Sequence, residues 1–253
     1  MDKKIALVTG ATSGIGRATC LELGRSGYRL IASGRDADAL IQIRDDLRSQ
    51  GLEVDSFRAE MRDADSRRQL ASFVSDSHGD IDALVNCAGI IGNGTIENTS
   101  IEDWDAMLEI NLTAVFHLMQ LSVPLLERRK GSIVNVSSVA GTRAFPNVIA
   151  YCVSKAGVDQ LTRCAALDLA PKGIRVNAVN PGVVVSNLHR RGGMDESRYE
   201  EFLEHSKTTH PLGRVGQPEE IADLISFLVS EKSGWITGVT YEIDGGRALT
   251  CAR

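Results

Sequence analysis

The chain has 253 residues, of which 43% are hydrophobic and 24% charged, and its formal net charge is −5. A chain of this length and composition can bury a large core, which argues against disordered or fibrous structure. The small negative charge argues against a protein that binds nucleic acid or is drawn to anionic membranes.

Cysteine usage and the N-terminus indicate the compartment. The cysteines are odd in number and show no Cys-x-x-Cys spacing, so we expect reduced, mostly buried thiols and no metal site. The apolar run at residues 5–8 is too short for a signal peptide, and we expect no apolar stretch long enough to span a bilayer. The sequence therefore favours a cytoplasmic protein. The cysteines are Cys20, Cys87, Cys152, Cys164 and Cys251.

Short apolar runs alternate with longer segments of helical periodicity along the whole chain. The runs predict strands at residues 5–8, 30–33, 54–59, 83–86, 133–136, 176–179 and 239–243. The longer segments predict helices at 14–26, 36–50, 63–78, 100–128, 150–170 and 218–230. Strands that are apolar throughout belong in a parallel sheet covered on both faces. The predicted fold class is α/β, a doubly wound parallel sheet of about seven strands in a three-layer α/β/α sandwich.

Residues 183–217 form the one long stretch without a predicted strand. The stretch is polar, carries Gly192-Gly193 and contains Pro211 near its end. No linker, repeat or low-complexity tract suggests a second domain. We therefore expect residues 1–253 to form one dinucleotide-binding and catalytic domain, with a substrate lid at about 183–217.

A glycine-rich turn follows the first predicted strand. Residues 9–16 read Thr-Gly-Ala-Thr-Ser-Gly-Ile-Gly, with glycine at positions 10, 14 and 16. Glycine there permits a tight turn and close approach to a pyrophosphate, and the following helix N-terminus attracts negative charge. The spacing differs from Gly-x-Gly-x-x-Gly, and a plain tight turn would have the same composition. Its place between strand and helix favours a dinucleotide site.

The end of the second strand distinguishes NADP from NAD. An acidic residue at that point would bind the ribose 2′-hydroxyl of NAD and repel the 2′-phosphate of NADP. Here the chain reads Ser33-Gly34-Arg35, and the guanidinium can bind a phosphate through two parallel hydrogen bonds. We therefore favour NADP(H) over NAD(H). Asp36 could cap the next helix or form an ion pair with Arg35.

Tyr151 and Lys155 stand four residues apart, on one face of a predicted helix. An ammonium beside a phenol stabilises the phenolate and lowers the tyrosine pKa toward the range of a general acid/base. Taken alone, this spacing is more often that of a half-buried ring under a lysine side chain.

Two further polar residues accompany this pair. Ser138 follows the fifth predicted strand, where it could hold a substrate carbonyl oxygen together with Tyr151, or cap a turn. Asn111 interrupts an apolar helical segment, so we expect it to bind backbone, water or ligand.

Together these motifs resemble the short-chain dehydrogenase/reductase family, and in particular its 3-oxoacyl-[acyl-carrier-protein] reductase members. They stand in that family's order over essentially the whole chain. Seven motifs in register are specific, whereas each alone is common. The motifs are residues 9–16, Asn86-Cys87-Ala88-Gly89, Asn111, Ser138, Tyr151 with Lys155, Asn180-Pro181-Gly182 and Asp244-Gly245-Gly246.

The resemblance implies a Rossmann fold and an oxidoreductase that moves a hydride between a nicotinamide and a carbonyl or alcohol substrate, without a metal. Tyr151 is implied as general acid/base and Ser138 as hydrogen-bond partner of the substrate oxygen. Lys155 is implied to bind the nicotinamide ribose and lower the tyrosine pKa. Asn111 is implied to hold a water of a proton relay.

The resemblance also implies the cofactor contacts. Ser186 replaces the usual threonine and keeps the hydroxyl, whereas Glu60-Met61 replaces the usual Asp-Val pair near the adenine, which puts the role of Glu60 in doubt. The implied contacts are Gly10, Thr12, Ser13, Gly14, Ile15, Gly16, Arg35, Glu60, Met61, Asn86, Ala88, Gly89, Tyr151, Lys155, Pro181, Gly182, Val184 and Ser186.

The family resemblance further implies a homotetramer, formed by the helices predicted at 100–128 and 150–170 and by the last strand. Apolar residues on those helices fit subunit contacts and packing within the chain equally well; they are Leu118, Leu121, Val158, Leu161 and Leu167.

Several alternatives stay open. Arg190 and Arg191 could recognise an acidic substrate or simply face solvent, and we interpret His189, His205 and His210 as structural or surface residues. The rival functions are a non-catalytic NAD(P)-binding regulator on the same fold and a sugar-nucleotide epimerase, which would need a further substrate domain. Ketoacyl thioesters, steroids, sugars, polyols and small ketones are all compatible substrates, and a ketoacyl or small-ketone reductase is favoured.

Overall fold

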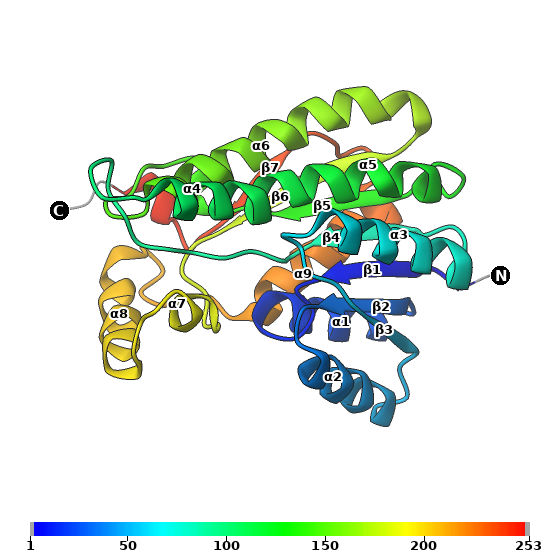
Figure 1. The fold of residues 1–253 in the computed structure, drawn as a ribbon, viewed down its shortest axis with the longest axis horizontal. Coiled ribbons are helices and arrows are strands. Elements are labelled where there is room, and N and C mark those ends of the chain that lie inside the picture. Colours follow the sequence, from blue (N-terminus) through cyan, green and yellow to red (C-terminus); the bar gives the residue numbers. More distant parts are fainter. Residues whose placement is uncertain (1–2, 251–253) are drawn as a thin grey trace.

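The computed structural model describes residues 3–250, and all the predicted strands form within two residues of their expected bounds. They pair side by side in parallel in the order β3-β2-β1-β4-β5-β6-β7 (Figure 1). The predicted doubly wound Rossmann fold is therefore confirmed. The strands are β1 (Ile5–Thr9), β2 (Arg29–Gly34), β3 (Val54–Arg58), β4 (Ala83–Asn86), β5 (Ser132–Val136), β6 (Arg175–Pro181) and β7 (Thr240–Ile243).

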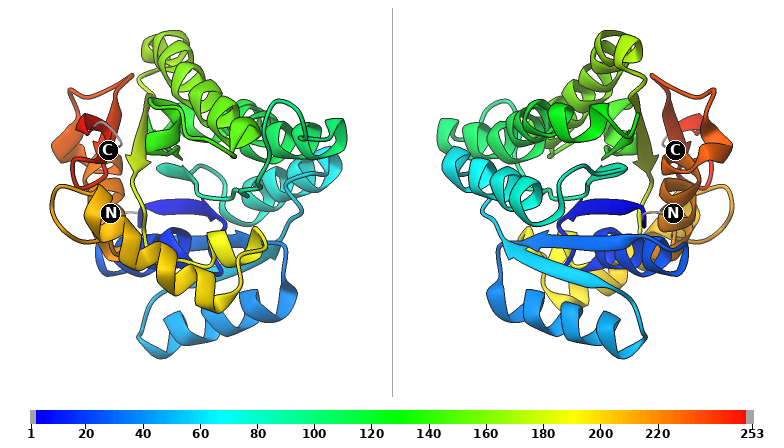
Figure 2. Two further views of the ribbon diagram at one scale, coloured as in Figure 1. Left: turned by 90° about the vertical axis from the view of Figure 1, so that its left-hand side faces the viewer. Right: turned by 90° about the vertical axis from the view of Figure 1, so that its right-hand side faces the viewer.

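Helices cover both faces of the sheet (Figure 2). One apolar cluster joins α1, α2 and α9 to one face, and a second joins α3, α5 and α6 to the other. Successive residues of β1 supply the two clusters in turn, which explains why a strand buried on both faces reads as a continuous apolar run. The helices are α1 (Gly14–Arg25), α2 (Ala37–Ser49), α3 (Ala64–His78), α4 (Ile101–Leu108), α5 (Ala114–Glu127), α6 (Ile149–Leu169), α7 (Leu188–Arg191), α8 (Glu196–Thr209) and α9 (Pro218–Val229).

The long helix predicted at 100–128 is interrupted by a π-helical turn. Helices α4 and α5 are continuous through η1 (Glu109–Thr113), which contains the buried Asn111. Within the described residues this is the one helix, Ile101–Glu127, that is long and apolar enough to cross a membrane, with a hydropathy of 1.3. The expectation that no apolar stretch reaches that length is therefore wrong. Its buried side chains pack in the core against α3 and the sheet.

The segment at 183–217, predicted to lack a strand, leaves the sheet after β6, and its two ends lie side by side. Backbone hydrogen bonds join Val185 to Gly216 at 3.1 Å and Gly216 to Val183 at 2.9 Å. Between these points the chain forms α7 and α8, and the Asp195 side chain caps α8. In Figure 1 both helices lie on the side to which the carboxyl ends of the strands point. The segment is thus a folded excursion tied at its base.

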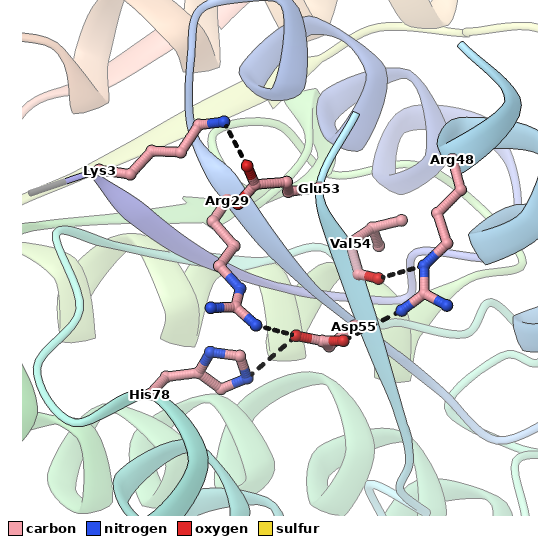
Figure 3. A network of polar contacts seen from close by, with 7 residues as sticks. All are labelled: Lys3, Arg29, Arg48, Glu53, Val54, Asp55 and His78. Carbon is pink, nitrogen blue, oxygen red and sulfur yellow. Dashed lines mark hydrogen bonds and ion pairs between the residues drawn. The ribbon is translucent and has the colours of Figure 1, made fainter. Parts of the chain in front are cut away.

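Charged side chains form a network at the opposite, amino-terminal end of the sheet (Figure 3). One carboxylate oxygen of Asp55 accepts a hydrogen bond from Arg29 at 2.8 Å, and the other accepts from Arg48 at 3.1 Å. The His78 imidazole lies 3.6 Å from the same carboxylate, and Lys3 forms an ion pair with Glu53 nearby. These groups anchor the edge strand β3 to its neighbours.

The cysteines differ from expectation in their burial. Of those described, only Cys20 is buried; Cys87 and Cys152 are half-buried and Cys164 is exposed. All four are free thiols, and Cys251 lies outside the described residues. The prediction of mostly buried thiols therefore holds for Cys20 and in part for Cys87, whose thiol pKa is raised by burial, and it fails for the exposed Cys164.

Candidate active site

Two glycines in the turn after β1, Gly10 and Gly16, have no room for a side chain. Thr9 accepts hydrogen bonds through its hydroxyl from the backbone of Cys87 and Ala88, at 3.1 and 3.2 Å, which joins the ends of β1 and β4. A Cβ at Gly10 would lie 2.8 Å from the Ala88 nitrogen, and one at Gly16 would lie 2.3 Å from the Gly10 oxygen. The sequence thus needs glycine there to bring a bare backbone to the start of α1, as a pyrophosphate site requires.

The end of β2 presents an unpaired cation. Asp36 caps α2, accepting from Ala39 at 3.1 Å, and it forms no ion pair with Arg35. Within residues 3–250 the Arg35 guanidinium has no hydrogen-bond or ion-pair partner, while its backbone oxygen accepts from Arg58 at 2.9 Å. Of the alternatives for Asp36, capping is the one that forms. The guanidinium is left available for an anion.

The paired tyrosine and lysine lie on one face of α6, as expected. Both side chains are buried, and the Lys155 ammonium lies 5.7 Å from the centre of the Tyr151 ring. The ammonium donates to the backbone oxygen of Val136 at 2.8 Å, which fixes it against the end of β5. Ser138 follows the same strand and its hydroxyl accepts from Ala140 at 3.1 Å, so the turn-capping alternative for this serine also holds.

The ionisation of this pair differs from the prediction. Burial raises the pKa of Tyr151 to about 12, opposed by the neighbouring Ser138 hydroxyl. Burial also lowers the pKa of Lys155 to about 8, opposed by Asp159 and Cys87. The tyrosine pKa is thus raised and not lowered in this state, because the desolvation of the phenolate dominates. At neutral pH the phenol therefore holds its proton, as a proton donor must.

Asn111 is bound to backbone, one of its three expected partners. Its side-chain oxygen accepts from the Ile90 nitrogen and its amide donates to the Ile90 oxygen, both at 2.9 Å. The amide also donates to the Ser154 hydroxyl at 3.1 Å. The side chain thus ties the π-helical turn to the loop after β4 and to α6, and it does not line the cavity described next. A water held by Asn111 would have to bind its backbone oxygen.

One cavity of about 600 Å³ joins the glycine turn to the tyrosine and lysine. Asn86 does not line it: the Asn86 side chain is buried and donates to Asn135 at 2.9 Å, joining β4 to β5. The predicted residues that line it are Gly10, Thr12, Ser13, Gly14, Ile15, Gly16, Arg35, Glu60, Met61, Ala88, Gly89, Ser138, Tyr151, Lys155, Pro181, Gly182, Val184 and Ser186.

Sequence reasoning assigned no site role to the residues that close the other end of the cavity. Phe145 packs in the small apolar cluster that contains Tyr151, and Arg247 lies 5.3 Å over its ring. His189, Phe202 and His205 line the cavity from the segment at 183–217. No spacing or motif marks these positions, because loop conformation brings them together. His189 and His205 were interpreted from the sequence as structural or surface residues. In the structure both also line the cavity.

His210 is structural, as interpreted. It is buried, its Nε2 accepts from the Val183 nitrogen at 3.1 Å, and its Nδ1 lies 2.7 Å from the Ser206 oxygen. This arrangement fits a neutral imidazole with the proton on Nδ1. His210 therefore fastens α8 to the loop after β6.

A buried carboxyl group supports the same loop. The Asn180 amide donates to Asp159 at 2.8 Å and to the Ser138 backbone oxygen at 3.1 Å. Burial raises the pKa of Asp159, opposed by hydrogen bonds from Ser137 and Asn180. Asp159 and Asn180 thus connect α6, the turn at Ser138 and the end of β6.

Known proteins resemble this chain over nearly its full length. A family model described as enoyl-(acyl carrier protein) reductase matches residues 10–248. The 3-oxoacyl-[acyl-carrier-protein] reductase of Thermotoga maritima is 40% identical over 98% of this chain and 99% of its own. The chain belongs to the short-chain dehydrogenase/reductase family. Within that family, the cyclohexanol dehydrogenase of an Acinetobacter strain is 36% identical over 96% of this chain and 94% of its own.

Solved structures of the family confirm the fold. A variant of the actinorhodin polyketide ketoreductase, determined with NADPH, superimposes with a TM-score of 0.91 at 33% identity and covers 98% of both chains. The relatives named above are enzymes, so the alternative of a non-catalytic regulator is not supported. This short-chain dehydrogenase/reductase is an oxidoreductase of carbonyl and alcohol groups.

Proposed function

We propose that this enzyme reduces a ketone or 3-oxoacyl group with NADPH and oxidises the corresponding secondary alcohol in reverse. The observation that carries the proposal is one continuous cavity lined both by the glycine turn and by Ser138, Tyr151 and Lys155. When bound, the reduced nicotinamide supplies the hydride for the substrate carbon. The chain's own residues bind and orient the cofactor and the substrate, and they protonate the substrate oxygen.

In the reduction, the Tyr151 phenol donates its proton to the substrate oxygen. Its raised pKa keeps that proton in place until negative charge develops on the oxygen. Ser138 donates a second hydrogen bond to the same oxygen and so stabilises the developing charge. Lys155 binds the nicotinamide ribose, and its ammonium stabilises the phenolate that Tyr151 becomes when it gives up its proton. The backbone of Asn111 holds a water that returns protons from solvent.

The remaining cavity residues bind the cofactor in this proposal. The turn at residues 10–16 and the N-terminus of α1 bind the pyrophosphate, because backbone N–H groups and the helix dipole both attract it. Glu60 and Met61 lie beside the adenine, and Ala88 and Gly89, which follow the buried Asn86, flank the adenosine. Pro181 and Gly182 with the backbone of Val184 and the hydroxyl of Ser186 hold the carboxamide.

The preference for NADP(H) rests on Arg35. Its guanidinium is exposed and unpaired within the described chain, and Asp36 turns away to cap α2. We expect Arg35→Ala to weaken NADP⁺ binding by at least about tenfold, about 1.4 kcal/mol, and to leave NAD⁺ binding unchanged. Paired measurements of both dissociation constants check this, and a loss below tenfold contradicts it.

The substrate enters under the segment at 183–217, which we propose as the lid of a single domain spanning 1–253. Its ends are tied by the backbone bonds at Gly216, and its helices bring apolar and basic side chains to the cavity. The relatives include a 3-oxoacyl reductase and a cyclohexanol dehydrogenase, which supports a small-molecule carbonyl or alcohol as substrate.

We also propose a cytoplasmic homotetramer that contacts neither nucleic acid nor membrane. Leu118 and Val158, considered for subunit contacts, are buried in the chain's own core. Phe116, Val153 and Leu167 remain exposed on α5 and α6, and they support an interface on the outer faces of these helices. Light scattering measures the assembly, and Leu167→Glu should dissociate it.

The decisive experiment assays a panel of carbonyls with NADPH and NADH in wild type and Tyr151→Phe. Tyr151→Phe should lose turnover by about 10²- to 10⁴-fold and keep its affinity for NADPH, because only the transferred proton is removed. No reduction of any carbonyl by the wild type, or full turnover by the variant, would overturn the proposal.

A further inference from the structure

Two adjacent arginines on α7 have opposite surroundings. The Arg190 guanidinium donates to both carboxylate oxygens of Glu196 at 2.6 Å and lies 3.8 Å over the Tyr199 ring. The Tyr199 hydroxyl donates to the Ser186 backbone oxygen at 3.0 Å. Arg190 is therefore neutralised by a local, partly exposed ion pair within the segment at 183–217.

Arg191 instead reaches across to the glycine turn. Its Nη1 donates to the Ser13 hydroxyl at 3.1 Å, a contact between residues 178 positions apart. Arg191 lines the cavity, whereas Arg190 does not. Among the residues described, no carboxylate pairs with Arg191, and the bond to Ser13 is the only polar contact of its guanidinium. A guanidinium carries five N–H groups, so most of its donors are free.

The point that Arg191 reaches, at the start of α1, also carries partial positive charge. Ser13 precedes α1, and its side chain makes no capping bond to that helix. The helix N-terminus and Arg191 therefore direct partial and full positive charge to the same point of the cavity. The base of the segment is close as well, because a Cβ placed on Gly14 would lie 3.1 Å from the Ser186 Cβ. Two positive groups meeting at a neutral hydroxyl form a site for an anion.

We infer that Arg191 binds the pyrophosphate of the dinucleotide and thereby links the segment at 183–217 to the cofactor. This rests on the proposed function. A phosphate of an acyl-carrier substrate has the same chemistry, but Arg191 contacts the turn between β1 and α1, whereas Ser138, Tyr151 and Phe145 mark the substrate end. A phosphate oxygen is a stronger acceptor for a guanidinium than the Ser13 hydroxyl.

The test compares Arg191→Gln with Arg190→Gln, two neighbours of equal charge. Arg191→Gln should weaken NADP⁺ and NAD⁺ by a similar factor of about tenfold, because both carry the pyrophosphate. It should leave 2′-AMP, which lacks the pyrophosphate, unchanged. Arg190→Gln should leave all three dissociation constants within about twofold, and Arg191→Lys should recover part of the lost affinity.

A second readout follows the segment itself. NADP⁺ should slow cleavage by a glutamate-specific protease in wild type, because α8 contains Glu200, Glu201 and Glu204. Arg191→Gln should lose this protection at saturating NADP⁺, and its thermal midpoint without ligand should match that of the wild type.

Three results overturn the inference. NADP⁺ and NAD⁺ affinities within about twofold of wild type would remove the pyrophosphate contact. A parallel loss for 2′-AMP would indicate a general charge effect. A raised KM for a phosphopantetheine thioester with unchanged cofactor affinity would assign Arg191 to the substrate. Each is independent of whether Tyr151→Phe abolishes turnover, so this inference can fail while the proposed function stands.

Discussion

Positively charged side chains are paired with carboxylates at one end of the sheet and lack such ion pairs at the other. At the amino-terminal end, Arg29 and Arg48 share the carboxylate of Asp55, and Lys3 pairs with Glu53 (Figure 3). Lys4 pairs with Glu231 at the same end. At the carboxyl end the cavity is lined by four cations that form no ion pair with a carboxylate of the described chain. These cations are Arg35, Lys155, Arg191 and Arg247.

This difference separates charges that stabilise the fold from charges kept for a ligand. An ion pair between partly exposed groups adds modest stability and leaves neither partner free. A buried or cavity-facing cation without a carboxylate costs desolvation energy, and an anionic ligand recovers it. The net charge of the whole chain is −5 and gives no sign of this local excess of positive charge at the cavity. The same substitution made at each end should therefore have opposite consequences.

The largest effect is expected for Lys155→Met. Turnover should fall by about 10²- to 10⁴-fold, because the buried ammonium beside Tyr151 is lost. The thermal midpoint should not fall. Since the folded-state pKa of Lys155 is lowered to about 8, its charge opposes folding below that pH, and methionine removes the charge while keeping the apolar stem. Steady-state kinetics and calorimetry measure both.

Lys4→Met is the matched control at the other end. Lys4 pairs with Glu231 at 2.7 Å on the surface, so this variant should keep its turnover and lose at most about 1 kcal/mol of stability. If Lys155→Met destabilised the protein and retained activity, the contrast between the two ends would be wrong.

The second prediction concerns pH. Below pH 8 Lys155 is charged, and an anionic cofactor binds that form and raises its pKa. NADP⁺ affinity should therefore fall by up to about tenfold between pH 7 and pH 9, as the pKa of about 8 is passed. Fluorescence titration of NADP⁺ at each pH gives the profile. Lys155→Met should show a flat profile, and an equal slope in both proteins would exclude Lys155 as the source.

The end that carries the cavity was also the harder to predict. The place of Gly16 and Tyr151 in the cavity wall could be predicted, because backbone crowding and helix spacing constrain residue type at short range. The strands were predictable because residues buried on both faces are apolar. In contrast, Arg191 and Arg247 reach the cavity through loop conformation, which no local pattern encodes.

The hydrogen-bond partners and the ionisation of buried side chains could not be predicted from the sequence either. Asn86 and Asn111 stand in the expected motifs, yet their side chains bind Asn135 and Ile90 inside the protein. The raised pKa of Tyr151 also escaped prediction, because desolvation depends on burial by residues far away in the chain. Sequence spacing therefore indicated which groups meet but not which atoms they bind.

The third prediction tests the paired end. Asp55→Asn leaves Arg29 and Arg48 without their shared carboxylate, and these groups are partly exposed. The free energy of unfolding should fall by about 1 kcal/mol, and the loss should shrink at high salt. Cofactor affinity and turnover should not change. Urea unfolding at two salt concentrations measures the loss, and Glu53→Gln, which breaks only the exposed pair to Lys3, should cost less.

The smallest effect is the acid sensitivity of His78. Its side chain is 1% exposed, and burial lowers its pKa, aided by Arg29 and opposed by Asp55. A histidine whose folded pKa is lowered takes up its proton more readily when unfolded, so stability should decrease as the pH falls below about 6.5. His78→Phe should reduce this slope in urea unfolding between pH 7 and pH 5. Asp55→Asn should steepen it, because the opposing carboxylate is gone; an unchanged slope in both variants would place the acid sensitivity elsewhere.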